Sequence, residues 1–264
     1  MLVATARLAP GVVLVTVPRR GLAVRTPDGR FLRVNTGAAG EEELLAHLAD
    51  GGPGNPRLLS LARAFEEAGY TTRTPAPAPL DGRTVVVLGD PELAGPLTRC
   101  VRDAGATVRS DFRVEDPHRT AVVWCLNRPA AEGIWEEADE LPRRGTAWLR
   151  CHREGAHAWL EPLACAPGDV TSAHVRLRRL AATPAYRELS AYWAGHATPD
   201  EAPGHSQASA ALTAALLTGD LIAWAGGASL PVRRRLRRID LRDLTVTEHP
   251  VLPVPRVAPL DPRR

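Results

Sequence analysis

The amino-acid sequence predicts an α/β protein of two domains. The main observation is a β-branched apolar run at residues 84–88, followed by a helical pattern and another short strand. That succession is the β–α–β unit of a sheet whose strands are buried on both faces. A second observation is the alternating Pro-Ala segment at residues 75–79, whose polyproline stiffness predicts a linker between residues 1–74 and 80–264.

The first domain reads as an α+β module of winged-helix-like character. Residues 18–21 and 27–29 supply turn chemistry between its strands. Its second helix begins at Asn55-Pro56, a capping residue followed by proline, and carries an apolar face. The predicted elements are strands 12–17, 22–25 and 31–34, helices 41–49 and 55–69, and a further strand at 71–74.

The second domain is predicted to be Rossmann-like. Gly89 ends its first strand, and Asp90 is expected to cap the helix that follows. Pro91 suits the first helical position, because no intrahelical partner exists there for an N–H group. Gly105 ends this helix, and a strand at residues 106–108 completes the β–α–β unit, where a Rossmann-type protein holds a nucleotide.

The remaining elements alternate in the way expected of an α/β core. Residues 205–225 form a helix rich in small residues, which predicts close packing against another element or a second subunit. The other expected elements are a strand at 121–126, an acidic helix at 131–140, a hairpin of strands 146–151 and 156–160, a helix at 171–195, and an antiparallel strand pair at 232–240 and 244–248.

The composition excludes several classes of protein. No apolar run of membrane-spanning length and no basic-then-apolar leader are evident, so a soluble cytoplasmic protein is expected. All 33 basic residues are arginine, which excludes any mechanism that needs a lysine. The cysteines form no C-x-x-C pair and lie in apolar contexts, which predicts reduced core residues: Cys100, Cys125, Cys151 and Cys165.

Several short motifs occur in an order that resembles one known family. They are Arg7–Val12, Gly145–Leu149, Glu161–Leu163 through Pro167–Gly168, Leu177–Arg179 and His249–Pro255. The chain resembles the ocin-ThiF-like proteins of azoline-forming natural-product clusters, in which a RiPP recognition element is fused to a degenerate ThiF-like domain. The resemblance spans nearly the whole chain and implies the same two-part organisation.

The resemblance implies a non-catalytic role. Such proteins bind the leader of a ribosomal precursor peptide and present its core to a YcaO-type cyclodehydratase. That enzyme uses ATP to convert Cys, Ser or Thr into thiazolines or oxazolines. The expected partners are therefore the precursor peptide and the cyclodehydratase, with a homodimer as a further expectation and with neither nucleic acid nor membrane.

The resemblance also implies where the leader binds. Recognition elements of this kind add an extended leader to a sheet edge, and its side chains dock between strand and helix. Arg57 and Arg63 would then meet acidic leader residues, whereas the alternative for each apolar member is a plain core role. Residues 50–55 leave no room for the middle helix usual in such modules. The implied groove residues are Phe31, Leu32, Arg33, Val34, Arg57, Leu58, Leu61, Phe65 and Tyr70.

Many relatives carry two C-x-x-C pairs that bind a structural zinc ion. The corresponding positions here hold Thr171 and His174, then Val257 and Leu260. Of these four side chains only the imidazole can ligate a metal, and a closed tetrahedral site needs four ligands. No zinc is therefore expected.

The loop at residues 89–95 departs from a dinucleotide-binding fingerprint. That fingerprint needs G-x-G-x-x-G, so that backbone N–H groups can approach a pyrophosphate. Here the middle glycine is missing, Pro91 has no N–H, and Asp90 and Glu92 would repel phosphate; Asp111 remains a candidate ribose ligand. Neither ATP nor another cofactor is expected. An adenylating or redox enzyme of ThiF or Rossmann type stays as an alternative.

The densest basic run, Arg233–Arg238, raises nucleic acid as a partner. With the winged-helix-like module, it keeps a DNA-binding regulator as a further alternative. The alternation around Leu236, with Asp240 and Asp243 nearby, instead favours the solvent face of an edge strand. None of the eight histidines belongs to a metal-ligating or catalytic pattern, so surface or capping roles are expected for them.

Overall fold

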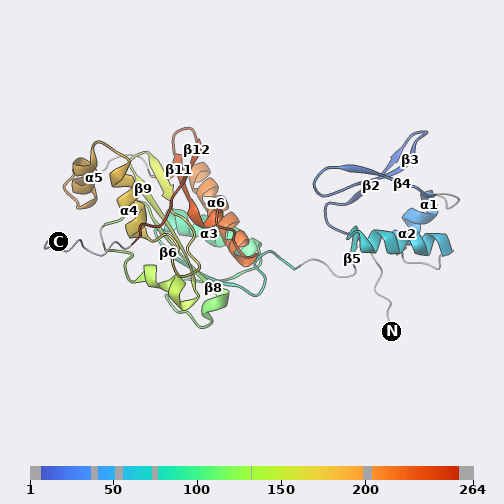
Figure 1. The fold of residues 1–264 in the computed structure, drawn as a ribbon, viewed down its shortest axis with the longest axis horizontal. Helices are drawn as coiled ribbons and strands as arrows, with labels where there is room; N and C mark the ends of the chain where they lie inside the picture. The colour runs from blue at the N-terminus through green and yellow to red at the C-terminus, as the bar shows by residue number, and fades with distance from the viewer. Residues whose placement is uncertain are drawn as a thin grey trace, which may run out of the picture. The chain divides into compact units, whose positions relative to one another are not determined.

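The structure is a computed structural model that describes residues 7–36, 41–50, 56–72, 77–131, 133–198 and 204–255. The chain divides into two compact units, Met1–Pro77 and Ala78–Arg264, each described by itself (Figure 1). Both units combine strands with helices, and the predicted α/β fold class is confirmed.

The first unit contains a three-stranded antiparallel sheet in the order β2-β3-β4, which corresponds to the first three predicted strands. Its strands are β2 at Val13–Val17, β3 at Gly21–Arg25 and β4 at Phe31–Val34. The helices are α1 at Glu41–Asp50 and α2 at Pro56–Glu67, and a short antiparallel pair joins β1, Arg7–Leu8, to β5, Thr71–Thr72. The segment at residues 51–55, where no middle helix is expected, lies outside the described residues.

The core of the first unit lies between one face of the sheet and the two helices. Leu22 and Val24 alternate along β3, so both side chains point to this face and are buried. The other buried members are Val12, Leu44, Leu48, Leu58 and Phe65.

The second unit contains a seven-stranded mixed sheet in the order β12-β11-β10-β9-β8-β6-β7. Strand β6 pairs in parallel with β7 and β8, β8 pairs in parallel with β9, and the remaining pairs are antiparallel. The strands are β6 at Thr84–Gly89, β7 at Thr107–Arg109, β8 at Thr120–Leu126, β9 at Ala147–Glu154, β10 at His157–Leu160, β11 at Arg235–Asp240 and β12 at Val246–Pro250.

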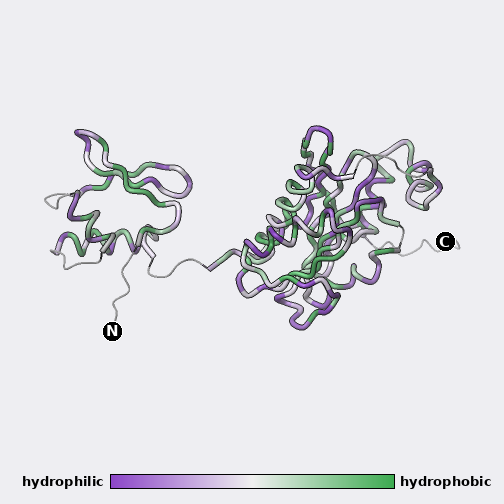
Figure 2. Tube along the Cα trace, turned by 180° about the vertical axis from the view of Figure 1, so that it is seen from behind, coloured by the Kyte–Doolittle hydropathy of each residue, from purple (hydrophilic) through white to green (hydrophobic). Residues whose placement is uncertain are grey.

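Helical segments cover both faces of this sheet. Val85 and Val87 of β6 share one hydrophobic cluster with helices α3 and α6, whereas Val86 belongs to another on the opposite face. Figure 2 shows hydrophobic residues concentrated along the central strands. The helical elements are α3 at Pro91–Asp103, α4 at Ser172–Ala181, α5 at Tyr186–Trp193, α6 at Gln207–Ala225, and the 3-10 turns η1 at Pro117–Arg119, η2 at Ala138–Arg144 and η3 at Val232–Arg234.

Two predicted helices differ from the structure. The α-helix expected at residues 131–140 is wrong: turns there lead into η2, and Gly133 adopts a positive φ of 81°, which α-helical geometry excludes. The helix expected at 171–195 is two helices, α4 and α5. Pro184 disfavours the helical conformation for the residue before it, which explains the break.

Helix α6 confirms the predicted small-residue helix and is the only described helix long and apolar enough to cross a membrane by length and composition. The sequence pattern had not indicated such a run. A core helix passes the same test, and one face of α6 packs in the core with α3. Its buried residues are Ser209, Ala210, Thr213, Ala214, Leu217, Thr218, Asp220, Leu221 and Trp224.

Candidate functional site

Strand β4 lies at an edge of the first unit's sheet, and its inner side chains are unequally covered. Leu32 and Val34 pair with the buried Val24 and Leu22, so they face the core side of the sheet. Val34 packs against the core, but Leu32 remains 45% exposed. The inner face therefore carries a half-open apolar position beside the edge strand.

The remaining groove candidates fall into two groups. Leu58 and Phe65 of α2 are buried, and Leu61 and Tyr70 pack partly buried against them, so these four belong to the core of the unit. Phe31, at 61% exposure, and Arg33 point to the other face of the sheet, because they alternate with Leu32 and Val34.

Arg57 lies at the start of α2, and its Nε donates to the Thr36 carbonyl at 3.3 Å, which connects the helix to the segment after β4. Arg63 is exposed on α2. The structure thus brings Val34 into one apolar cluster with the α2 residues Leu58, Leu61 and Phe65, whereas Leu32 lies on the same face of the sheet but outside that cluster. Phe31 and Arg33 lie on the outer face of the sheet.

In the second unit, the carboxyl ends of β6 and β8 form the position where the order of parallel strands reverses. Open α/β sheets bind ligands at such a crevice. Gly89 has a φ of 104°, and a Cβ there would overlap the Cys125 carbonyl of β8. Asp90 N donates to that carbonyl at 2.9 Å, so the loop lies directly against the neighbouring strand.

Polar side chains of the chain itself fill this crevice. Asp90 is at the N-cap position of α3, but the predicted side-chain cap is wrong, because its Oδ2 accepts from the Asn127 backbone N at 2.6 Å. The Asn127 amide donates to Glu92, and Arg153 Nε donates to the Asn127 Oδ1 at 2.9 Å. Gly204, just before α6, packs against Asn127 and Glu92 and closes the loop from the other side.

The candidate ribose ligand is occupied in a similar way. Arg109 Nε and Nη2 donate to the two carboxylate oxygens of Asp111 at 3.0 and 2.8 Å. The hydrogen bond from Arg109 is the main cause that lowers the pKa of Asp111. Asp111 is therefore paired with Arg109 of the neighbouring strand β7.

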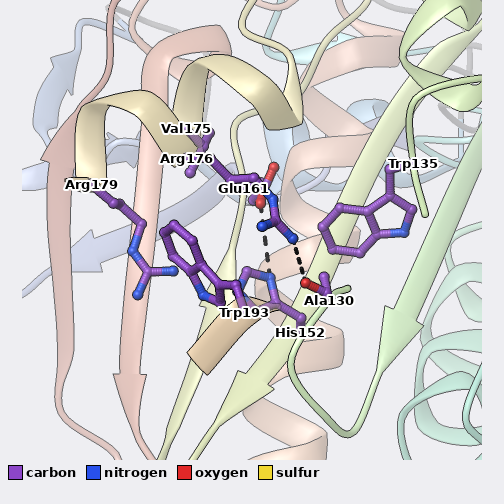
Figure 3. A pocket seen from close by; sticks show the side chains of 8 residues that line it. All are labelled: Ala130, Trp135, His152, Glu161, Val175, Arg176, Arg179 and Trp193. Carbon is purple, nitrogen blue, oxygen red and sulfur yellow. Dashed lines mark hydrogen bonds and ion pairs between the residues drawn. The ribbon is translucent and has the colours of Figure 1, made fainter. Parts of the chain in front are cut away.

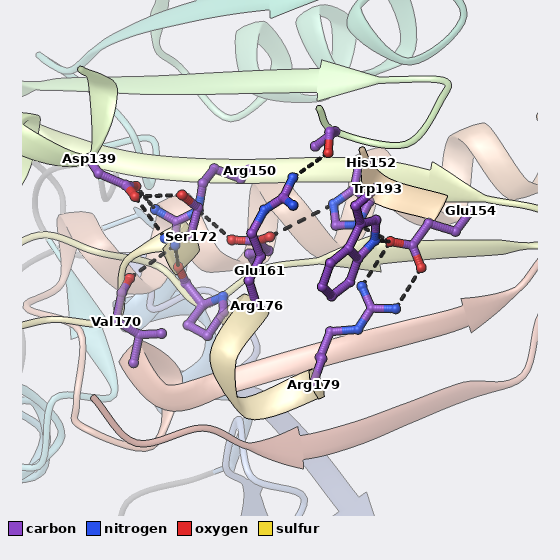
Figure 4. Close-up of polar contacts among 12 residues, drawn as sticks. Asp139, Arg150, His152, Glu154, Glu161, Val170, Ser172, Arg176, Arg179 and Trp193 are labelled. Atoms are coloured by element: carbon purple, nitrogen blue, oxygen red, sulfur yellow. Dashed lines mark hydrogen bonds and ion pairs between the residues drawn. The ribbon is translucent and has the colours of Figure 1, made fainter. Parts of the chain in front are cut away.

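Beneath α4 lies a buried polar network centred on Arg150 of β9 (Figure 4). Its guanidinium donates to Glu161 at 2.7 Å, to Asp139 at 2.8 Å, and to the carbonyls of Pro162 and Val170 at 3.2 and 3.0 Å. The Arg150 side chain is completely buried, so these acceptors replace the water it loses.

Asp139 connects this network to helix α4. One oxygen accepts from Trp148 Nε1 and Arg150, and the other accepts from the backbone N and Oγ of Ser172 at 2.8 and 2.6 Å. Ser172 is the first residue of α4, so the carboxylate also occupies the positive end of that helix.

A second part of the network surrounds Glu154. Arg179 of α4 donates to both of its oxygens, Trp193 of α5 donates at 2.7 Å, and His152 Nε2 lies 3.1 Å away. Burial alone would raise the pKa of Glu154, but the hydrogen bonds from His152 and Arg179 outweigh it and hold this pKa well below the usual range. Both helices are thereby fastened to the end of β9.

A void of about 10 Å³ lies between the two parts of this network (Figure 3). Trp135 Nε1 and His152 Nδ1 are buried there without a hydrogen-bond partner in the described structure. Glu161 faces the same void, and burial raises its pKa. A space of this size holds at most about one water molecule, so it is not a substrate pocket.

Two of the four positions that the resemblance aligns with zinc ligands cap a helix in this chain. Thr171 and His174 form a reciprocal capping box at the start of α4: the Thr171 Oγ1 accepts from His174 N, and Nδ1 of the imidazole accepts from Thr171 N. Val257 and Leu260 lie outside the described residues. No group of potential metal ligands occurs in the described part of the chain.

The basic run leads into an internal strand, β11, so the expectation of an edge strand is wrong. The edge strand is β12, and β11 is paired on both sides. Arg237 Nη1 and Nη2 donate to both oxygens of the buried Asp220 at 2.7 and 2.8 Å, Arg235 donates to the same carboxylate, and Arg233 pairs with Asp169. Three members of the run are thus committed to ion pairs within the unit.

Sequence reasoning missed the Arg150 network. Its one local signal is a charged residue inside the apolar run Trp148-Leu149-Arg150-Cys151, which marks a buried arginine that needs acceptors. The acceptors themselves come from residues 139, 161, 162 and 170, and no spacing in the sequence links them. The motifs around 145–149 and 161–168 therefore contribute to a structural centre.

No protein-family model and no curated protein matches this chain. Among solved structures, a heterocyclase in complex with substrate and cofactor is similar over 94% of this chain at 12% identity and a TM-score of 0.64. The heterocyclase TruD is similar over 96% at 14% identity and the same score of 0.64. A chain of the E. coli microcin synthetase McbBCD complex with pro-MccB17 bound is similar over 96% at 10% identity and a score of 0.53.

These likenesses concern the fold. The match spans only 38% and 42% of the lengths of the two heterocyclases, whereas it spans 98% of the synthetase chain. The matched region includes nearly all of both units, so the succession of a small α+β unit and an α/β unit recurs in proteins of heterocycle formation.

Proposed function

We propose that this chain is a non-catalytic scaffold that binds the leader of a ribosomal precursor peptide and presents it to a YcaO-type, ATP-dependent cyclodehydratase. The observation that carries the proposal is the edge strand β4, whose half-exposed Leu32 lies on the inner face of the sheet, next to Val34 and the apolar core. An edge strand next to an apolar groove is a recurrent way to bind an extended peptide.

The fold comparisons support the same reading. Two similar structures are heterocyclases, and one of these was solved with substrate and cofactor. A third is a synthetase complex with a precursor, pro-MccB17, bound.

The non-catalytic part of the proposal rests on the crevice of the second unit. Asp90, Asn127 and Glu92 hydrogen-bond one another where a nucleotide phosphate would lie. Two carboxylates at that position oppose phosphate binding, and the sequence supplies no lysine to offset them. We therefore assign ATP-dependent chemistry to the partner and neither ATP nor zinc to this chain.

Isothermal titration of the full chain with the precursor peptide encoded beside it tests this function. We expect saturable binding to the intact precursor and to its leader alone, and no binding to the core peptide alone. The core peptide serves as the matched control. Absence of heat with the intact precursor, while the chain is folded by circular dichroism, would contradict the proposal.

A DNA-binding regulator is the alternative that the winged-helix-like module raises. The arginines of the 233–238 run are largely committed to Asp169, Asp220 and Glu248, which removes its main support. Binding to duplex DNA at two salt concentrations distinguishes the two functions, because phosphate contacts weaken steeply as salt rises. We expect no salt-sensitive binding.

A homodimer remains part of the proposal. The outward face of α6 exposes Ala211, Ala215 and Gly219, and it carries no exposed charged residue. Small residues at this spacing allow close approach of a second helix. Sedimentation velocity of the full chain at several concentrations gives the oligomeric state, and a monomer throughout would remove the dimer from the proposal.

A further inference from the structure

The backbone pairing of β4 shows which of its main-chain groups face the open edge. Thr26 N donates to the Arg30 carbonyl at 2.9 Å, which marks this pair as hydrogen-bonded. In an antiparallel ladder hydrogen-bonded and non-hydrogen-bonded pairs alternate. Leu32 and Val34 therefore direct their N–H and C=O groups to β3, whereas Phe31 and Arg33 direct theirs outward. Four main-chain groups in the strand are available to an added strand.

The same register fixes where the side chains of an added strand point. A residue opposite Leu32 or Val34 faces the inner side of the sheet, which carries the apolar core. A residue opposite Phe31 or Arg33 faces the outer side of the sheet. Successive side chains of an extended ligand thus contact opposite faces of the sheet in turn.

The outer side of this sheet is basic. Arg25 and Arg33 are diagonal neighbours on it, and neither pairs with a carboxylate in the described structure. The strand residues that share this face include no acidic side chain: Val13, Val15, Val17, Ala23, Arg25, Phe31 and Arg33. Charge complementarity therefore favours an acidic residue in the ligand.

We infer that the leader alternates apolar residues, over Leu32 and Val34, with acidic residues beside Arg33, and that its backbone bonds to Phe31 and Arg33. This inference rests on the leader-binding function proposed above and adds the chemical pattern that the site selects. Arg33 is a specificity-determining residue in this scheme, because it is exposed and contributes nothing to the core.

Short synthetic peptides test the pattern without knowledge of the natural leader. A fluorescent probe with the core Val-Glu-Leu-Glu-Val reads the same in both strand directions, so the direction of addition does not matter. The comparison probe has the core Val-Arg-Leu-Arg-Val. Each is titrated by anisotropy into the full chain, into Arg33→Glu, and into Arg20→Glu, a matched charge reversal in the exposed turn between β2 and β3.

We expect the acidic probe to bind the full chain and to lose about tenfold in affinity with Arg33→Glu, as expected when an exposed attraction becomes a repulsion. The arginine probe should gain affinity for Arg33→Glu, and Arg20→Glu should leave both probes within about twofold of the full chain.

Two other results overturn the inference in different ways. If the natural leader binds but Arg33→Glu changes neither the leader nor the probes, the pattern is wrong and the proposed function stands. If neither the leader nor any probe binds the folded chain, both the pattern and the proposed function fail.

Discussion

The edge of β4 and the crevice at the ends of β6 and β8 are both places where backbone groups can meet a ligand. They differ in whether their polar groups already have hydrogen-bond partners within the chain. In the crevice, Asp90, Glu92 and Asn127 satisfy one another, and the segment at Gly204 packs over them. At β4 the main-chain groups of Phe31 and Arg33 have no strand beside them in the described sheet. The polar groups of the crevice are thus satisfied within the unit, whereas the edge groups of β4 have no such partner strand in the described sheet.

The edge of the large sheet sharpens this contrast. Asp240 N donates to the Thr245 carbonyl and Val251 N donates to the Arg234 carbonyl, so the odd-numbered residues of β12 bond to β11. The main-chain groups of the even-numbered residues therefore point to the open edge of the sheet. One of these residues is Pro250, which has no N–H to offer. Proline at such a position protects an edge against added strands. Strand β4 has no proline, which is consistent with an edge kept open for a ligand.

The largest effect is expected from Arg150→Ala in the second unit. Removing the guanidinium leaves Asp139 and Glu161 buried without their cation, and breaking such a pair costs about 3–5 kcal/mol. Urea unfolding followed by tryptophan fluorescence measures the loss, because all tryptophans lie in this unit. Arg144→Ala on the exposed end of η2 is the control and should change stability by less than about 0.5 kcal/mol. Equal effects of the two variants would contradict the structural role of the network.

The next effect concerns the open edge. Leu32→Asp places a charge at the half-exposed inner position, which should weaken leader binding about thirtyfold, because the apolar contact is lost and covering the carboxylate adds a desolvation cost. Leu59→Asp is the control, because Leu59 is similarly exposed but lies on α2 rather than on the edge strand. Isothermal titration with the precursor measures both. If the two variants bind alike, the groove beside β4 is not the leader site.

The parts of this molecule that sequence could predict are those governed by local rules. The run Thr84–Val87 is β-branched and apolar, so a buried strand follows from its residues alone. The break between α4 and α5 follows from Pro184, although the apolar spacing around it concealed the break. The strand and the helix break both depend on residues that lie within a few positions along the sequence.

The candidate sites could be predicted only in part. Leu32 and α2 were placed together by family resemblance, but which side chains of β4 face inward depends on the register with β3. The Arg235 and Arg237 pairs with Asp220 join residues from β11 and α6, and a basic run in sequence gives no sign of a buried acid elsewhere. Burial of charge is decided by tertiary contacts, which local patterns do not encode.

A smaller effect is expected at His205, which lies where the chain closes the crevice. Burial, and then the charge of Arg153, lower the pKa of His205 to about 4 from its ordinary value of 6.5. Since the folded pKa is the lower one, the unfolded chain binds the extra proton. Stability is therefore fully present above pH 6.5 and is lost as the pH falls toward 4.

In the variant His205→Asn, the loss of unfolding free energy on acidification should be smaller by about 1–2 kcal/mol. This is less than the whole pKa shift would give, because the ring is partly exposed. Asparagine retains a polar group near the Nδ1 position that lies 3.2 Å from Ser209 Oγ. Denaturant unfolding of both proteins between pH 7.5 and pH 4.5 measures the difference. Parallel pH profiles would show that the ring is not held neutral in the folded chain.

The smallest expected effect is the absence of a shift with ATP. A nucleotide present at about 100 times its dissociation constant would stabilise the chain by about 2.7 kcal/mol, or about 5–10 °C in Tm. We expect less than about 1 °C with magnesium and ATP, because Asp90 and Glu92 already accept hydrogen bonds where phosphate would bind. The variant Asn127→Ala is the matched comparison, since it removes the amide that bonds to Glu92 and leaves the two carboxylates in place.

If ATP stabilises the natural chain, the crevice opens to ligands and the contrast with β4 fails. If ATP stabilises only the variant, the asparagine is what closes the crevice; no shift in either protein means that the carboxylates alone exclude phosphate.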